Sequence, residues 1–176
     1  MKNIVFIGMP GSGKTIIATM LATRLGRPYI DIDSVIAARH FASSASIRAK
    51  FGENYFRDLE SGIVGEASRN NNVIMSTGDG VVLLPKNIDV LSKNGILVFL
   101  KASPDTLLLR LGQNPLFLPL LSNEPNIRQK MDRLWRDREP LYRKAAHETV
   151  DTERLNLEQV VDEVVKKLKG RSDIEV

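Results

Sequence analysis

The residues with the most specific chemical pattern lie near the start of the chain, in the segment 8-GMPGSGKT-15. This segment fits the phosphate-loop pattern G-x-x-x-x-G-K-[ST] at every specified position. A glycine-rich turn lets backbone N–H groups wrap around anionic oxygens, and the helix expected to begin at Lys14 points its positive end at them. Lys14 would reach the β- and γ-phosphates, and the Thr15 hydroxyl would bind Mg²⁺. The segment predicts a nucleoside triphosphate site made by Gly11, Ser12, Gly13, Lys14, Thr15 and Ile16.

Two aspartates follow at the end of the next apolar run, in 31-DID-33. In a strand, residues two apart point the same way, so Asp31 and Asp33 are expected to share a face. One carboxylate there could hold Mg²⁺, and the other could accept a proton from an acceptor hydroxyl. An alternative is that Asp33 caps a helix starting at Ser34. Both interpretations stay open on spacing alone.

Two arginines are candidates for binding an organic acid. Arg57 lies in 53-ENYFRDLE-60, with Glu60 one turn later and able to steer it, and Arg138 lies in 136-RDREPLYRK-144. A planar guanidinium suits bidentate recognition of a carboxylate. Between them, the turn 78-GDG-80 follows a buried apolar run, where glycines let backbone approach a ligand closely.

The elements that must position these residues follow from the hydrophobic pattern. Short apolar runs predict strands at 3–7, 29–32, 73–76, 95–100 and near 148–151. Helical patterns cover 14–25, 35–69 with breaks near 43–46 and at Gly52, a stretch after Pro85, 104–112, about 127–145 and 157–168. Alternating strands and helices indicate an α/β fold with a parallel sheet covered on both faces, whose ligands lie beyond the carboxyl ends of the strands.

Composition limits the class of protein. The chain has 176 residues, 43% hydrophobic and 26% charged, which is typical of one globular domain. It has no cysteine, which excludes disulfides and thiol catalysis, and no apolar run near the roughly 20 residues that a bilayer requires. The formal net charge is +4, without a basic stripe interleaved with aromatic residues. We therefore expect a cytoplasmic protein without nucleic-acid or membrane partners, and a small-molecule kinase rather than a motor.

The order of these motifs resembles the shikimate kinase family. The motifs GMPGSGKT, DID, YFRDLE, STGDGVV, and REPLYR followed by ETVDT keep that family's order and spacing over about residues 3–168. The resemblance implies the three-layer α/β/α fold of the nucleoside-monophosphate-kinase type, with a five-stranded parallel sheet and a mobile lid at about 112–125. It implies one domain over residues 1–170, a disordered tail at 171–176, and a monomer. The implied reaction transfers the γ-phosphoryl of ATP to the 3-hydroxyl of shikimate, a step toward chorismate and the aromatic amino acids.

The resemblance also assigns roles to matching positions. Lys14 and Thr15 keep their phosphate and Mg²⁺ roles, Asp31 matches a magnesium-associated aspartate, and Asp33 matches the residue that binds the shikimate hydroxyls and is the proposed base. Arg57 and Arg138 match the pair that holds the shikimate carboxylate. The remaining implied contacts are Gly78, Asp79 and Gly80 to shikimate, and Arg110, Asp151 and Thr152 near the adenine.

Two positions depart from the family pattern. The family has three glycines where this chain has Gly78, Asp79 and Gly80, and an arginine where this chain has Leu118. The Asp79 carboxylate would face an anionic substrate, and like charges about 4 Å apart cost on the order of 1 kcal/mol in water and about 4 kcal/mol at an effective dielectric constant of 20. Asp79 could also be strained if its φ is positive, or it could turn to Mg²⁺, Lys14 or Arg57.

The departures leave three interpretations open. The chain is a shikimate kinase of full or reduced activity, a related phosphate-loop kinase for another hydroxy acid, or a non-catalytic relative that binds nucleotide. Loss of the lid arginine removes a charge that can contribute about 10³ to 10⁵ in rate.

Overall fold

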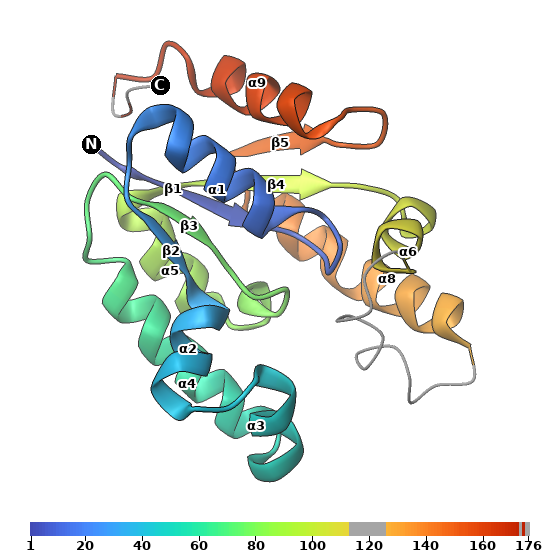
Figure 1. The fold of residues 1–176 in the computed structure, drawn as a ribbon. Helices are drawn as coiled ribbons and strands as arrows, with labels where there is room; N and C mark the ends of the chain where they lie inside the picture. The colour runs from blue at the N-terminus through green and yellow to red at the C-terminus, as the bar shows by residue number, and fades with distance from the viewer. Residues whose placement is uncertain (113–125, 173, 175–176) are drawn as a thin grey trace.

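The computed structural model describes residues 1–112, 126–172 and 174. Its sheet has five parallel strands in the order β2-β3-β1-β4-β5 (Figure 1). The strands are β1 (Asn3–Ile7), β2 (Tyr29–Asp31), β3 (Ile74–Ser76), β4 (Gly95–Lys101) and β5 (Glu148–Asp151). The five-stranded parallel sheet predicted from the sequence is confirmed.

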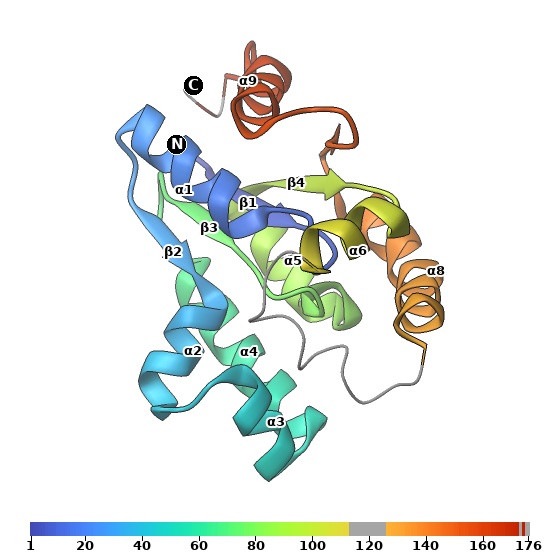
Figure 2. The same cartoon turned by 45° about the vertical axis from the view of Figure 1, so that its right-hand side comes forward.

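Helices cover both faces of the sheet, because alternate strand residues point to opposite sides. In β1, Ile4 and Phe6 pack under α1 (Lys14–Leu25) and α9 (Leu157–Leu168). Val5 and Ile7 pack on the other face, in a core with α4 (Glu53–Ala67), α5 (Pro85–Asn94), α6 (Pro104–Gly112) and α8 (Ile127–Ala145). The two views of the ribbon show these three layers (Figures 1 and 2).

The helical pattern predicted over 35–69 is divided into three helices beside β2. They are α2 (Ile32–His40), α3 (Ser44–Phe51) and α4. The Ser43 side chain caps α3 by accepting a hydrogen bond from the Ser46 N–H, and Gly52 separates α3 from α4 with a φ of 87°, which favours glycine. Both breaks lie where the sequence predicts them.

The boundary between β2 and α2 differs from the prediction. The strand ends at Asp31 and the helix begins at Ile32, so Asp33 lies in the first helical turn rather than on a strand face shared with Asp31. The capping role also belongs to Asp31, whose Oδ1 accepts a 2.8 Å hydrogen bond from the Ser34 N–H. A carboxylate is stabilised there because the first N–H groups of a helix have no partner within the helix.

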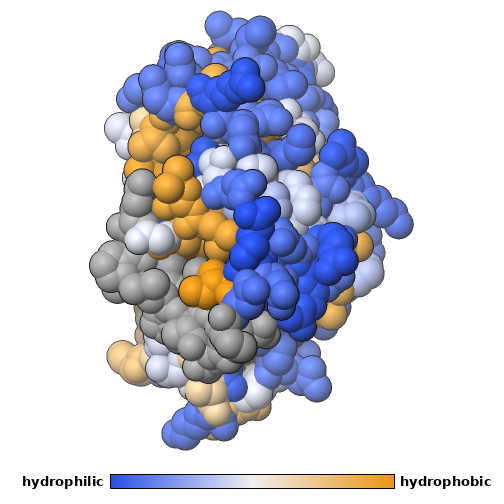
Figure 3. Space-filling view, turned by 90° about the vertical axis from the view of Figure 1, so that its right-hand side faces the viewer, coloured by the Kyte–Doolittle hydropathy of each residue, from blue (hydrophilic) through white to orange (hydrophobic). Residues whose placement is uncertain are grey.

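The lid predicted at 112–125, with Leu118, lies outside the described residues except for Gly112. Within the predicted tail at 171–176, Arg171 contacts Glu148 at 3.5 Å and Ile174 is buried beside α9; the domain boundary at 170 stays a prediction. Over the described ranges, none of the helices has the length and apolar character needed to cross a membrane. On the side that carries α6 and α8, hydrophobic residues form a strip next to a hydrophilic surface (Figure 3).

Candidate active site

The phosphate loop joins β1 to α1 and has backbone angles that require glycine. Gly8, Gly11 and Gly13 all have positive φ, and a Cβ at Gly8 would lie 2.8 Å from the Leu100 carbonyl oxygen. Gly13 directly precedes α1, so the unpaired N–H groups of the helix start open toward the loop. The Ser12 hydroxyl is buried without a hydrogen-bond partner among the described residues. The loop is built to accept an anion.

Lys14 lies over this loop. Its Nζ donates hydrogen bonds to the carbonyl oxygens of Gly8 at 2.9 Å and Met9 at 3.0 Å. Burial lowers the pKa of Lys14, and the negative charges of Asp79 and Asp33 only partly oppose that effect.

Thr15 and Asp31 supply the oxygen ligands that Mg²⁺ prefers. The Thr15 hydroxyl donates to Asp31 Oδ2 at 3.1 Å, and the hydroxyls of Ser76 and Tyr29 reach the same oxygen at 2.6 and 3.0 Å. Burial acts to raise the pKa of Asp31, but the hydrogen bonds from Ser76, Ser34 and Tyr29 outweigh it, so the pKa is lowered and the group is ionised. Within the described part of the chain, no three His, Asp or Glu residues gather as a metal site.

Asp33 faces the same cavity, but its pKa is shifted in the opposite direction from that of Asp31. Burial raises the pKa of Asp33, the negative charges of Asp79 and Asp31 raise it further, and Lys14 and Arg48 oppose them. Its Oδ1 is buried without a hydrogen-bond partner among the described residues. A carboxylate in this state binds a proton more readily than an ordinary aspartate, as a general base requires.

These groups line one large cavity of about 890 Å³. Its lining residues include Lys14, Thr15, Asp31, Asp33, Asp79, Arg110 and Thr152. The two sequence-predicted aspartates and the phosphate loop are therefore brought together.

Arg57 extends from α4 and is held firmly by two carboxylates. Its Nη1 contacts Glu60 Oε2 at 2.8 Å, and its Nη2 contacts Glu53 Oε1 at 2.5 Å. Glu60 is fully buried, while Glu53 also contacts Arg48 Nε at 3.1 Å. The steering role that the sequence suggests for Glu60 is confirmed.

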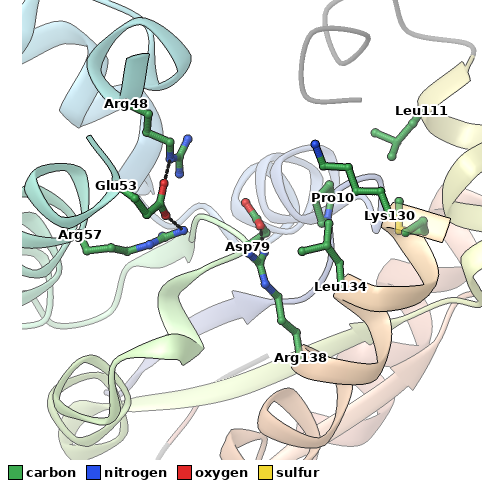
Figure 4. Close-up of a pocket in the computed structure, with 10 residues that line it drawn as sticks. Pro10, Arg48, Glu53, Arg57, Asp79, Leu111, Lys130, Leu134 and Arg138 are labelled. Atoms are coloured by element: carbon green, nitrogen blue, oxygen red, sulfur yellow. Dashed lines mark hydrogen bonds and ion pairs between the residues drawn. The ribbon is translucent and has the colours of Figure 1, made fainter. Parts of the chain in front are cut away.

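Arg57 and Arg138 meet at a second cavity of about 170 Å³, which adjoins the first (Figure 4). The close-up shows Arg57 approaching from α4 and Arg138 from α8, with Asp79 between them. Both cavities are lined by Pro10, Arg48, Asp79 and Leu111. The two arginines therefore share a site next to the phosphate loop, as predicted.

Asp79 forms an ion pair with Arg138, which is none of the partners considered from the sequence. Burial acts to raise the pKa of Asp79, but Arg138, Lys14, Arg48 and Arg57 outweigh it and keep the carboxylate ionised. Among the described non-glycine residues only Phe41 and Asn72 have positive φ, so the concern about strain at Asp79 is wrong.

The two neighbours of Asp79 have to be glycines because functional side chains pack against them. A Cβ on Gly78 would lie 2.7 Å from Glu60 Oε1 and 3.0 Å from Asp33 Oδ1. A Cβ on Gly80 would lie 2.1 to 2.2 Å from the guanidinium atoms of Arg57. The Tyr142 hydroxyl donates a hydrogen bond to the Asp79 backbone carbonyl, which fixes the turn against α8.

Arg110 and Thr152 also line the large cavity. The Arg110 guanidinium donates to the Thr152 hydroxyl at 3.0 Å and to its carbonyl oxygen at 2.8 Å. Asp151 is not among the lining residues; its side chain is 58% exposed and contacts Lys101 at 3.3 Å. Ile16, at the start of α1, lines the cavity as expected.

Sequence reasoning missed two cations of the site. Lys130, Leu134 and Arg138 all line the small cavity, and their spacing of four residues, which places them on one face of α8, could have identified Lys130. Arg48 lines both cavities, and its guanidinium lies 3.6 Å from the centre of the Phe56 ring. No local pattern marks Arg48, since α3 meets the site only through tertiary packing.

Comparison with known proteins gives one consistent family. A family model described as shikimate kinase matches residues 10–169. Shikimate kinases of Caldanaerobacter subterraneus subsp. tengcongensis and Symbiobacterium thermophilum are 41% and 39% identical, covering 97% of this chain in both cases and 100% and 98% of those proteins. A solved shikimate kinase from Acinetobacter baumannii, in complex with shikimate, is 29% identical with a TM-score of 0.90, over 97% of this chain and 96% of that one. With its phosphate loop, paired aspartates and facing arginines in one site, the chain belongs to the shikimate kinase family.

Proposed function

We propose that this protein is an ATP-dependent shikimate kinase, which transfers the γ-phosphoryl group of ATP to the 3-hydroxyl of shikimate. The observation that carries the proposal is that Lys14 and Asp33 line one cavity while Arg57 and Arg138 line the adjoining one. A phosphate donor and a carboxylate-bearing acceptor can thus meet at a base. Family membership gives the same acceptor.

The large cavity suits ATP. The backbone N–H groups of residues 11–16 would surround the phosphates, and Arg110 with Thr152 would lie near the nucleoside. Thr15 and Asp31 would hold Mg²⁺, since a hydroxyl and an ionised carboxylate 3.1 Å apart are hard oxygen donors. The metal ion would supply positive charge that neutralises phosphate oxygens during transfer.

The smaller cavity suits the acceptor. Arg57 and Arg138 would bind its carboxylate, and Asp33 would accept the proton of the attacking hydroxyl. Lys14 would stabilise the negative charge on the transferred group.

A coupled assay of ADP release tests the proposal. We expect ATP turnover that depends on both shikimate and Mg²⁺, and that is lost in Lys14→Met. Lys169→Met, which removes an exposed lysine after α9, is the matched control and should keep full activity. No shikimate-dependent turnover above the background ATPase rate would contradict the proposal, and turnover with a different polyol acid would indicate the related-kinase alternative.

We further propose that the protein acts as a monomer in the cytoplasm. Size-exclusion chromatography with light scattering tests the first point: a mass near 19.6 kDa supports it, and a mass twice as large contradicts it.

A further inference from the structure

Asp79 places a carboxylate of the protein itself in the site that would bind the carboxylate of the acceptor. Its side chain is 24% exposed, is paired with Arg138 and lines both cavities. An acceptor that reaches from Asp33 to the two arginines has to pass this side chain. Asp79 therefore lies between the phosphate-loop cavity and the arginine cavity.

The backbone around Asp79 is held in place, so the Asp79 carboxylate stays next to Arg138 as a ligand that belongs to the protein itself. Gly78 packs against Glu60 and Asp33, Gly80 packs against the Arg57 guanidinium, and the Tyr142 hydroxyl binds the Asp79 carbonyl. Tyr142 itself is buried and stacked on Phe99 at 5.1 Å between ring centres. An acceptor can displace the carboxylate only by rotating the Asp79 side chain.

Both arginines of the pair already contact carboxylates of the protein. Arg57 already contacts Glu53 and Glu60, and Arg138 contacts Asp79. Each guanidinium thus has a carboxylate partner from the protein. Lys14, Arg48 and Arg57 are the other cations whose charge acts on Asp79.

We propose that Asp79 is a specificity-determining residue, whose carboxylate occupies Arg138 and has to be displaced by the carboxylate of the acceptor. The inference rests on the proposed function and adds to it that Asp79 weakens the binding of acceptors with a negative charge at this position. Acceptors that carry a neutral group there are not repelled. The protein consequently discriminates less between shikimate and its methyl ester than it would with glycine at position 79.

The test compares Asp79→Gly and Asp79→Asn with the unchanged protein, using shikimate and shikimate methyl ester. We expect both variants to lower Kd and KM for shikimate about fivefold to a thousandfold, the range given by like charges about 4 Å apart between aqueous and protein-like surroundings. Affinity for the methyl ester should change little. Binding is measured by isothermal titration calorimetry and turnover by ADP release.

Asp137→Asn is the matched control. Asp137 is exposed, adjoins Arg138 on α8 and does not line either cavity, so its removal changes the net charge equally without freeing Arg138. Its affinity for shikimate should stay that of the unchanged protein. Thermal unfolding and binding of a non-hydrolysable ATP analogue establish that each variant is folded; Asp79→Asn keeps the side-chain shape if Asp79→Gly fails to fold.

The outcomes are distinguishable. The role of Asp79 is overturned if the variants bind shikimate as the unchanged protein does, or if their affinities for shikimate and for its methyl ester rise equally. In either case, turnover of shikimate by the unchanged protein leaves the proposed function in place. If the unchanged protein and all variants bind the ATP analogue but neither bind nor phosphorylate shikimate, the proposed function fails and the inference with it. Turnover of shikimate that appears only in the Asp79 variants supports the role of Asp79 but contradicts the proposed function of the unchanged protein.

Discussion

Asp33 and Asp31 are two residues apart yet differ in proton affinity, and this difference is what a phosphoryl-transfer site needs. Asp31 is surrounded by hydroxyl and N–H donors, which lower its pKa and suit it to a metal ion. The pKa of Asp33 is raised by burial and by neighbouring carboxylates, which suits it to accept a proton. Their roles therefore follow from their surroundings rather than from residue type.

Asp33→Asn should remove the base and also stabilise the fold. We expect kcat to fall about 10²- to 10⁴-fold. The pKa of Asp33 is raised in the folded protein. Such a carboxyl group lowers the free energy of unfolding as the pH rises from the pKa of the unfolded state through the pKa of the folded state. The variant should therefore unfold at a higher temperature at pH 7, and the difference should vanish at acid pH. A calorimetric scan from pH 3 to 8 checks this, with Asp89→Asn, an exposed aspartate on α5, as the control; a less stable Asp33→Asn would contradict it.

Gly80→Ala should weaken acceptor binding without a large effect on ATP. A Cβ there would lie 2.1 to 2.2 Å from atoms of the Arg57 guanidinium. The guanidinium cannot move away easily because Glu53 and Glu60 hold it. Loss of a charged hydrogen bond predicts a rise in KM for shikimate of about tenfold to a hundredfold.

Gly62→Ala is the matched control for that change. Gly62 lies inside α4 with open space where a Cβ would be, so alanine should stabilise the protein by about 0.5–1 kcal/mol and leave KM unchanged. Steady-state kinetics and urea unfolding of both variants separate the two effects. Equal KM values for shikimate in Gly80→Ala and Gly62→Ala would show that the close approach of Gly80 to Arg57 does not affect acceptor binding.

At the scale of elements, a capping box stabilises the start of α9, where Asn156 also lines the large cavity. Asn156 accepts a hydrogen bond from the Gln159 N–H at 2.9 Å, and the Gln159 side chain accepts one from the Asn156 N–H at 2.9 Å. Asn156→Ala should lower the free energy of unfolding by about 1 kcal/mol, which in a domain of this size lowers Tm by about 2–4 °C. Asn156→Asp keeps a capping oxygen and should stay near the original Tm. Equal losses in both variants would mean that the cap is not the cause.

The elements themselves could be predicted well because their patterns are local. The phosphate loop, the helix over 127–145 and the closing helix over 157–168 follow from glycine spacing, periodic apolar residues and caps. The boundary between β2 and α2 could not, because Asp31 and Asp33 are both competent N-caps and only the folded backbone decides between them.

The same limit applies to the site. The pairing of Arg57 with Glu60 is a contact within one helix turn and could be predicted. The partner of Asp79 could not, because Lys14, Arg57 and Arg138 carry the same charge and all lie far from Asp79 along the chain, so only the fold decides which of them it contacts. The sequence could predict a negative charge facing the expected acceptor site, whereas the cation that pairs with Asp79 is evident only in the fold.

At the scale of the whole molecule, one rigid sheet edge carries two adjoining binding cavities. Lys14, Asp31 and Asp79 lie at or just beyond the carboxyl ends of β1, β2 and β3, and they meet at the same edge because parallel strands end together. Helices from the two halves of the chain, α4 and α8, complete the smaller cavity. Each ligand should therefore bind the folded state alone and stabilise the whole domain.

Ligand-induced shifts in Tm measure this arrangement. A ligand at a hundred times its Kd stabilises a native protein by about 2.7 kcal/mol, which corresponds to a rise of about 5–10 °C here. Lys14→Met should lose most of the shift given by Mg²⁺ and the ATP analogue while keeping that given by shikimate, and Arg138→Gln should show the opposite pattern. Because Asp79 and Arg48 line both cavities, the shift with both ligands should differ from the sum of the single shifts. Additive shifts in the unchanged protein, together with loss of both single shifts in either variant, would show that the cavities are not the two halves of one active site.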